Sequence, residues 1–359
     1  RLLPLLKKKI KSNIWLGCAT GGTIGLDSNG MYQDSLNEPS ISVTLLKLPD
    51  TEILPFHIPE TSQFDLDNPI KFWRKHLNTE NLEKSSVMMF IDPMMPITKD
   101  LIGTFDDSFP NSKLIGGIGS FISSSSGSLF FEDSICRGAI GILFKGAWRL
   151  ENLVTKGVKP VGPIWEVESV KKNILLKLRN DERIVTPLES LEMLLADLPE
   201  REKDLLNKSL FLGVENKNMR IDKYGNLSYE GTFLVRDLLG IDPINGSVAV
   251  SDLLKVGQKV QYQSRDLQVS HDEIVLGMEK IANKIPDKPL LTILFSCFGR
   301  SKSFYNDKSL DLDNAQFFIR SAPLCGGFFQ GEIGQIDGNS YLHGYTSCWA
   351  FLVKSNNEK

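Results

Sequence analysis

The sequence lacks a long apolar run and an excess of basic residues. No run approaches the roughly 20 apolar residues with which a helix crosses a bilayer. Lys and Arg number 41 and Asp and Glu number 44, which gives a formal net charge of -3. Binding of nucleic acid needs a basic surface that neutralises phosphates. The composition therefore predicts a soluble protein that neither spans a membrane nor binds nucleic acid.

Cysteine and histidine are scarce and are not paired at short spacing. Five cysteines and four histidines occur, and no two cysteines form a CxxC pair. An odd, scattered set of cysteines is typical of a reducing compartment rather than of a disulfide framework. Zinc sites need Cys or His pairs at short spacing, and the closest mixed pair, His343 and Cys348, has no recognised ligand spacing. We therefore predict no metal site.

Motifs for nucleotide binding and hydrolysis are also missing. A P-loop requires Lys after its second glycine, but Thr23 follows Gly22 in the glycine-rich segment 17–25. A dinucleotide fingerprint starting at Gly117 fails because Ile122 takes the place of the third glycine. We identify no GxSxG elbow and no pair of catalytic carboxylates. Segment 17–25 is interpreted as a tight turn after a strand.

Short apolar runs bounded by Gly, Asn and Pro recur along the chain, which is the pattern of many β-strands. The length and composition of these runs are typical of buried or half-buried strands. The clearest strand predictions are residues 41–48, 87–91, 129–131, 139–144, 209–214, 247–250, 260–264 and 290–295.

Two sequence patterns predict the starts of helices. Thr186, followed by Pro187 and Glu189, is a capping box with proline at the first helical position. Ser270 and Glu273 have the spacing of a second capping box. Weaker helical periodicity occurs twice more. The helix predictions are residues 188–198, 270–285, 72–77 and 313–320.

The two halves of the sequence resemble each other. Residues 114–117, which contain a Gly pair, lead to a hairpin-like stretch, then to Arg137-Gly138 and a strand. Residues 324–327 contain the same Gly pair and lead to a turn, then to His343-Gly344 and a strand. This echo predicts an α+β fold of two related halves, with extensive, mainly antiparallel sheet flanked by helices.

The order of the glycine-rich motifs is similar to that of the FIST domain family. The segments that carry this resemblance are 17–25, 113–119, 137–141, 296–300, 324–329, 331–334 and 341–346. The resemblance implies a FIST N-terminal half at 13–165 and a FIST C-terminal half at 166–353, with prolines near the boundary. The family is linked to intracellular signalling and small-ligand sensing. The resemblance therefore implies a non-catalytic binding module that acts as a sensor or scaffold through a small ligand, protein partners, or both.

Arg300 and Glu332 are the charged residues that best suit a ligand site. Each follows small or glycine residues, where the turn of the backbone leaves room for a bound molecule. Arg can hold a carboxylate bidentately and Glu can accept from an amine, so the pair suits an amino acid, the ligand class proposed for the family. A salt bridge between the two residues explains the same pattern. Both interpretations stay open.

Cys297 and His343 belong to the same candidate ligand site. A free cysteine at the end of a strand is usually packed in the core, but a neighbouring His343 would make it a nucleophile. A cysteine-dependent enzyme is therefore kept as an alternative. Some proteins that resemble the family bind haem through a histidine, and the aromatic residues Tyr341, Tyr345 and Trp349 are close to His343 in the sequence. We predict no catalytic residue and no cofactor, with haem at His343 as the alternative.

The first eleven residues are basic with few acids, and the chain starts at Arg1. A truncated terminus and the remnant of a cleaved targeting peptide both explain this start. Segments 240–243, 256–258 and 265–266 resemble stand-alone FIST proteins of cyanobacteria and plastid-bearing organisms. The alternative function is therefore an accessory or linker subunit of a large photosynthetic complex. The expected location is the plastid stroma, or otherwise the cytoplasm.

Overall fold

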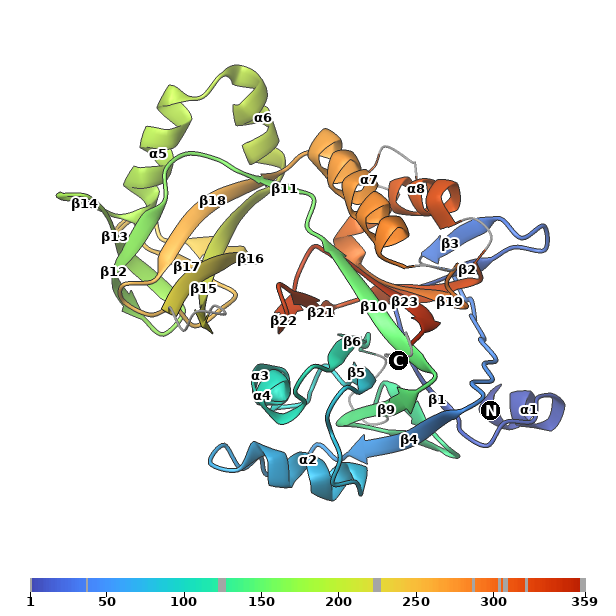
Figure 1. Cartoon of the computed structure of the whole chain (residues 1–359). Coiled ribbons are helices and arrows are strands. Elements are labelled where there is room, and N and C mark those ends of the chain that lie inside the picture. The colour runs from blue at the N-terminus through green and yellow to red at the C-terminus, as the bar shows by residue number, and fades with distance from the viewer. Residues whose placement is uncertain are drawn as a thin grey trace. The chain divides into compact units, whose positions relative to one another are not determined.

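The computed structural model describes residues 2–36, 38–121, 127–221, 227–285, 288–302, 305, 309–319 and 322–355. Runs of mainly antiparallel strands are interrupted by helices along the chain (Figure 1), which confirms the α+β prediction. None of the helices in these ranges is long and apolar enough to cross a membrane. The helices are α1 (Leu2–Lys9), α2 (Pro69–Leu77), α3 (Thr98–Gly103), α4 (Phe105–Ser108), α5 (Pro187–Asp197), α6 (Glu200–Lys208), α7 (Leu267–Lys284), the 3-10 helix η1 (Phe298–Arg300) and α8 (Leu310–Ile319).

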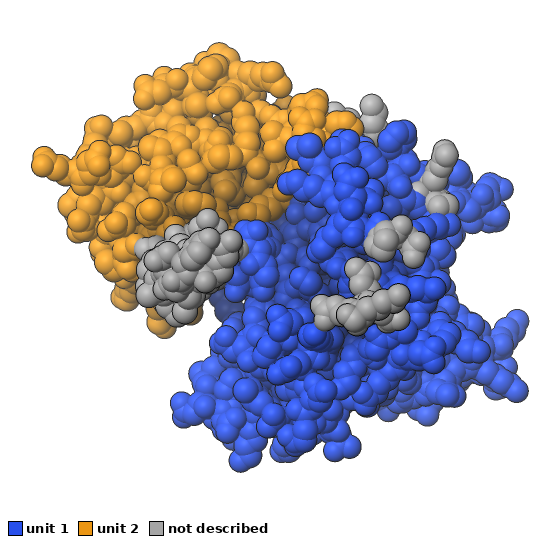
Figure 2. All heavy atoms as spheres, in the orientation of Figure 1, with its two compact units in different colours: residues 1–155, 274–359 blue, residues 156–273 orange. Residues whose placement is uncertain are grey.

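The chain divides into two compact units (Figure 2). Unit 1 comprises residues 1–155 and 274–359, and unit 2 comprises residues 156–273. Unit 2 is therefore an insertion in the sequence of unit 1. The predicted boundary near residue 165 divides the chain into consecutive halves instead, and it stays a prediction.

Unit 1 contains two six-stranded sheets and one small sheet. In each large sheet a single parallel pair, β19–β20 or β5–β6, is flanked by antiparallel neighbours. The first sheet has the order β10 (Trp148–Thr155), β23 (Ser347–Lys354), β19 (Leu291–Cys297), β20 (Leu324–Phe329), β2 (Gly22–Leu26) and β3 (Tyr32–Leu36). The second has the order β22 (Asn339–His343), β21 (Gly331–Ile336), β6 (Lys113–Ile118), β5 (Ser86–Ile91), β9 (Ala139–Gly146) and β4 (Thr51–Ile58). The small sheet is β1 (Leu16–Cys18), β7 (Leu129–Phe131) and β8 (Ser134–Cys136).

The echo in the sequence corresponds to a repeated order of elements. Strand β5, short helices, β6, the hairpin β7–β8 and β9 follow one another in the first half, and β19, α8, β20, the hairpin β21–β22 and β23 follow in the second. Gly116 lies opposite Met89 on the parallel neighbour, and Gly326 lies opposite Leu294 in the same way. A Cβ at either glycine would collide with the carbonyl oxygen of the residue opposite. The first glycine of each pair therefore has the same structural cause.

Three aromatic rings lie in the apolar layer between the two large sheets. The ring centroid of Phe295 lies 5.9 Å from that of Phe90 and 5.0 Å from that of Phe329. Gly117 makes room for this packing, because a Cβ there would meet the Phe329 ring. The outer face of the first sheet packs against α8 and the second part of α7 through residues such as Met278.

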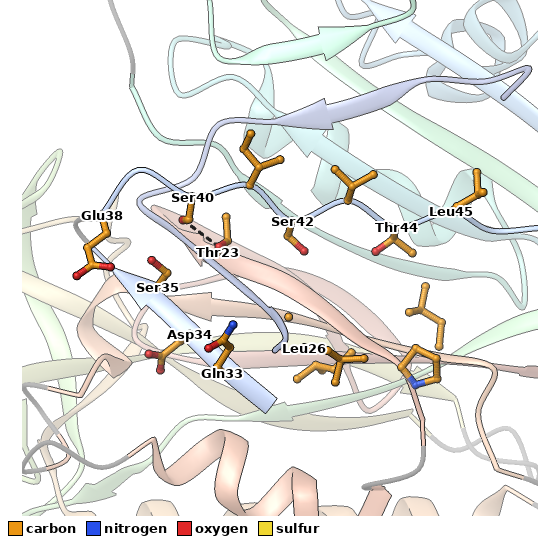
Figure 3. A pocket seen from close by; sticks show the side chains of 16 residues that line it. Thr23, Leu26, Gln33, Asp34, Ser35, Glu38, Ser40, Ser42, Thr44 and Leu45 are labelled. Atoms are coloured by element: carbon orange, nitrogen blue, oxygen red, sulfur yellow. Dashed lines mark hydrogen bonds between the residues drawn. The ribbon is translucent and has the colours of Figure 1, made fainter. Parts of the chain in front are cut away.

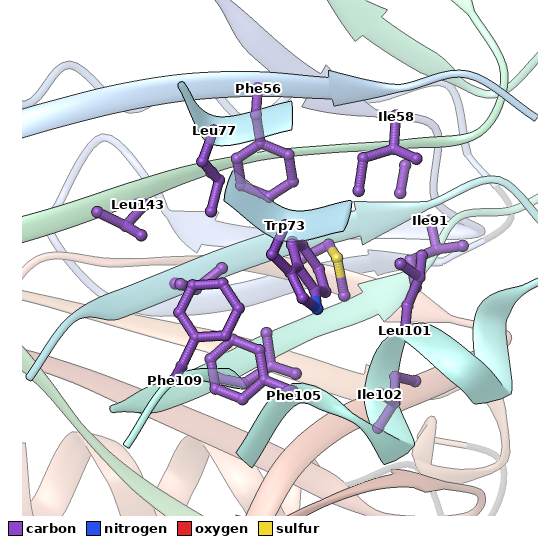
Figure 4. Close-up of a cluster of buried hydrophobic side chains, with 14 of the residues drawn as sticks. Phe56, Ile58, Trp73, Leu77, Ile91, Leu101, Ile102, Phe105, Phe109 and Leu143 are labelled. Carbon is purple, nitrogen blue, oxygen red and sulfur yellow. The ribbon is translucent and has the colours of Figure 1, made fainter. Parts of the chain in front are cut away.

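The outer face of the second sheet is covered by α2, α3 and α4 (Figure 4). Trp73 of α2 is fully buried at the centre of this cluster, and its ring makes edge contacts with Phe105 and Phe109. Because the indole is enclosed by side chains from both the helices and the strands, it joins the two layers.

Unit 2 is an eight-stranded, antiparallel sheet with α5 and α6, and its core includes Val167, Leu178, Leu191 and Leu194. Its strands are β11 (Val158–Pro160), β12 (Trp165–Lys171), β13 (Ile174–Asn180), β14 (Arg183–Val185), β15 (Leu210–Ile221), β16 (Leu227–Ile241), β17 (Val248–Val250) and β18 (Lys259–Arg265). The predicted capping box of α5 is confirmed, with Thr186 and Glu189 each bonding the other's backbone.

Two element predictions are wrong. Residues 41–48 form no strand, because no neighbouring strand pairs with them. Helix α7 begins at Leu267 rather than at Ser270. There, the Asp266 carboxylate accepts hydrogen bonds from the backbone nitrogens of Gln268 and Val269 and so caps the free N–H groups of the first turn. The helix therefore starts three residues earlier than predicted. The remaining strand and helix predictions correspond to β5, β7, β9, β15, β17, β18, β19, α2, α5 and α8.

Candidate functional site

Arg300 lies in η1, directly after β19, and its side chain has no exposed surface. Its Nε donates to Oδ2 of Asp311 at 2.9 Å and its Nη2 donates to Oδ1 at 2.8 Å. Asp311 stands in the first turn of α8 and also accepts from the Ser347 hydroxyl at 2.6 Å. The bidentate partner of Arg300 is thus Asp311, which no sequence motif identifies. An acidic residue in the first turn of a helix was the only available signal, and it is a common one.

Glu332 lies on β21 and is fully buried. Its Oε2 accepts from the backbone nitrogen of Thr346 at 3.2 Å and from the Thr346 hydroxyl at 2.8 Å. Its Oε1 has no hydrogen-bond partner within normal geometry in the described part of the chain. Burial raises the pKa of Glu332 to about 8, although the Thr346 contacts, the Arg300 charge and the Cys297 thiol lower it. At neutral pH the carboxyl is therefore mostly protonated and can donate as well as accept.

Two cysteines accompany this carboxyl. Cys297, the last residue of β19, is 8% exposed, and Cys348 of β23 is fully buried. The thiol of Cys348 has a pKa raised well above its usual value, first by burial and then by the neighbouring Glu332. A thiol that stays protonated is a poor nucleophile. Cys348 therefore forms part of the wall around the polar cluster of Arg300, Glu332, Cys297 and His343.

His343 lies directly opposite Glu332 in the β21–β22 hairpin, so both side chains leave the same face. The imidazole is 4% exposed, and its Nε2 lies 3.1 Å from the carbonyl oxygen of Gly334. The Tyr341 ring is 5.9 Å away, centroid to centroid. Coordination of haem iron through Nε2 would require the contact with Gly334 to break. The prediction of no cofactor, with haem at His343 as its alternative, stays a prediction. All four sequence-predicted residues belong to unit 1: Cys297 ends β19, Arg300 follows it in η1, and Glu332 and His343 lie on the paired strands β21 and β22.

The described residues contain no set of side chains that could serve as ligands of a metal ion. No group of three or more His, Cys, Asp or Glu side chains among them is placed to hold a metal ion.

A pocket of about 700 Å³ in unit 1 was not predicted from the sequence (Figure 3). It lies between the β2–β3 hairpin and residues 38–45, with Leu291, Pro323 and Leu324 at one end. Hydroxyl side chains from both sides line it, and Thr23 Oγ1 donates to Ser40 Oγ at 2.9 Å. The alternation of Ser or Thr with aliphatic residues over 40–45 was the available signal, and it was interpreted as a strand.

Comparison with known proteins identifies the family. A model of the FIST N domain matches residues 1–181, and a model of the FIST C domain matches residues 187–335. An uncharacterized protein of Mycobacterium tuberculosis is 25% identical over 354 residues, which cover 98% of this chain and 87% of that protein. An uncharacterized protein of Mycobacterium bovis is 26% identical over 268 residues, covering 74% of this chain and 67% of that protein. The chain therefore belongs to the FIST family and contains both its N and its C domain.

Proposed function

We propose that this chain is a non-catalytic binding module whose small ligand is recognised at Glu332. The family's association with sensing and ligand binding supports this proposal. The observation that carries it is the Oε1 atom of Glu332, which is buried and forms no hydrogen bond of normal geometry with a described residue, although the nearby Cys297 thiol lowers the Glu332 pKa. A buried polar atom left unpaired costs free energy, typically about 1–3 kcal/mol. A ligand that supplies the missing partner would recover that free energy.

The chemistry of the cluster favours a ligand with an N–H or O–H donor. Glu332 would accept from an amino group, as an amino acid provides, while Cys297 and His343 would form neighbouring walls. The guanidinium of Arg300 is held by Asp311 through two hydrogen bonds. In this proposal Arg300 therefore orients the cluster and supplies positive charge.

Calorimetry with a panel of amino acids and their des-amino analogues tests the proposal. We expect binding of at least one amino acid, weaker binding of its des-amino analogue, and loss of at least about tenfold in affinity in Glu332→Gln. Glu80→Gln is the matched control, because the Glu80 side chain is 85% exposed. Equal affinities of the parent and Glu332→Gln would remove Glu332 from the site. Arg300→Ala with unchanged heats would remove Arg300 as well.

A second proposal is a scaffold role through protein partners, with an accessory subunit of a plastid complex as its most specific form. Exposed aliphatic side chains support protein contact, since Ile41 and Leu45 are 56% and 66% exposed. Native mass spectrometry of the protein isolated gently from its source tests this role. A large co-purifying complex would support it, and a free protein with added small-molecule mass would support the ligand proposal instead.

A further inference from the structure

Residues 38–48, which connect β3 to β4, have an extended course but no backbone partner. None of their backbone N–H or C=O groups forms a backbone hydrogen bond with any other described residue. Their side chains are mostly exposed, with Leu48 buried at the end of the segment. An unpaired extended backbone at the surface is a template on which another strand can add.

The side chains of this 38–48 segment alternate as those of a strand do. On one face, Ser42 Oγ donates to the carbonyl oxygen of Ile24 at 3.1 Å, and the Thr44 side chain lies near the Cys325 thiol, whose pKa it lowers against the larger effect of burial. On the other face, Ile41, Val43 and Leu45 are 56%, 48% and 66% exposed. Figure 3 shows Ser42 and Thr44 pointing toward the strands and Leu45 pointing away from them. The hydroxyl contacts therefore hold the segment on the sheet and present a row of aliphatic side chains outward.

The adjoining pocket is lined by two acids, Asp34 and Glu38, and by no Lys, Arg or His among its described residues. Asp34 is paired with Lys302 at 2.9 Å, whereas Glu38 is exposed and forms no ion pair with a described residue. Serine, threonine and glutamine supply most of the other polar groups. A volume of about 700 Å³ is within the usual range for ligand sites.

We propose that the 38–48 segment is a docking site for an extended, basic strand of a protein partner. The partner's backbone pairs with the unpaired backbone of the segment. Its aliphatic side chains pack on Ile41, Val43 and Leu45, and its basic side chains lie over the pocket near Glu38. This is strand addition to an exposed edge, in which the main chain provides affinity and alternate side chains provide specificity. The site is independent of the Glu332 cluster.

A second copy of this chain is a poorer occupant on grounds of charge. Its own 38–48 segment would bring a second Glu38 to a pocket that already carries two acids, and it contains a single base, Lys47. The acid-rich lining therefore favours a partner of different sequence.

Fluorescence anisotropy with a synthetic peptide tests the proposal. The probe is a labelled peptide of about nine residues in which valine alternates with lysine, the length of an ordinary strand. Glutamate in place of lysine tests the charge, and N-methylation of alternate backbone nitrogens tests the pairing. We expect the lysine peptide to bind, and each modification to weaken binding at least about tenfold. Hydrogen exchange at residues 40–46 should slow when the lysine peptide binds.

The protein variants are Ile41→Lys and Ile244→Lys. Both replace an exposed isoleucine, and Ile244 is 95% exposed in unit 2. We expect Ile41→Lys to weaken peptide binding at least about tenfold and Ile244→Lys to leave it unchanged. Equal binding of the N-methylated or the glutamate peptide, or no saturable binding of the lysine peptide, would overturn the proposal. A dimer in analytical ultracentrifugation that Ile41→Lys dissociates would assign the segment to a second copy and overturn it too.

Discussion

Arg300 and Asp311 form a bidentate ion pair in which the arginine side chain has no exposed surface and the aspartate side chain is 6% exposed. The pair ties η1, at the end of β19, to the first turn of α8. It therefore fixes the position from which Arg300 acts on the rest of the polar cluster, including the carboxyl of Glu332.

Removal of Asp311 should destabilise unit 1 strongly. In Asp311→Ala the guanidinium of Arg300 stays buried without its counter-charge, and we expect a loss of about 3–5 kcal/mol in the free energy of unfolding. Urea unfolding followed by fluorescence measures this loss. The control is Glu200→Ala, because Glu200 pairs with Lys203 while its own side chain is 87% exposed, so we expect less than about 1 kcal/mol. Similar losses in both variants would contradict the importance of burial for this pair.

The stability of the protein should depend on pH through Glu332. Its pKa is about 8 in the folded state and close to 4.5 when exposed. Between these values the folded state holds a proton that the unfolded state releases, so the free energy of unfolding falls as pH rises. The full stabilising effect of the protonated form is present below about pH 4.5 and is lost as pH passes about 8.

Comparison of Glu332→Gln with the parent isolates this contribution. Glutamine does not titrate, so the variant should gain stability relative to the parent as pH rises from 5 to 8, on the order of 1 kcal/mol per pH unit. Urea unfolding at three pH values measures the difference. A difference that stays constant with pH would show that Glu332 titrates alike in the folded and unfolded states.

The two repeated glycines should tolerate no side chain. In Gly116→Ala and Gly326→Ala the new Cβ meets the carbonyl oxygen of Met89 or Leu294 on the parallel neighbour, and strands must separate. We expect each variant to lose at least about 2 kcal/mol of stability. Gly103→Ala is the control, because nothing lies within 4 Å of a Cβ at this helical position. Thermal unfolding should show a lower midpoint for the first two variants, and an equal or higher midpoint for the third.

The half-buried thiols of Cys136 and Cys325 should react slowly in the folded protein. Burial raises the pKa of Cys325 to about 11, and burial together with the charge of Asp92 raises the pKa of Cys136 to about 11. Because the thiolate is the reactive form, alkylation by iodoacetamide at pH 7 should be slow until the protein is unfolded. Mass spectrometry of the labelled peptides measures the rates. Rapid labelling of Cys297 alone would instead support the cysteine-dependent enzyme.

Local signals in the sequence were sufficient for most elements and insufficient for pairing. The capping box at Thr186 depends on residues three positions apart, and it is confirmed. Segment 41–48 has the alternation of a strand and was predicted as one, but a strand also needs a neighbour, which no local pattern specifies. The start of α7 was misplaced because Asp266 competes with Ser270 for the same capping role.

The candidate site was predictable only in part for the same reason. Arg300 and Glu332 were selected by their glycine-rich surroundings, and they do adjoin one polar cluster. Asp311 and Thr346 provide the hydrogen bonds that define the cluster, yet each comes from a separate element and has an ordinary local sequence. Glu332 matters to the site because its carboxyl is buried. This burial results from the sheets packed around it, and its neighbours in the sequence do not reveal it.

The pairing of strand β10 determines the order in which the two units can fold during synthesis. Its hydrogen-bonded partner is β23, and Leu150 pairs with Leu352 across a separation of about two hundred residues. Unit 2 lies wholly within that interval, so all its strands emerge from the ribosome before β23 does. A contact so distant in sequence forms slowly, whereas a unit of contiguous residues folds as soon as it is complete. The inserted unit should therefore reach its native state first, while β10 waits for a partner strand that is translated after the whole of unit 2.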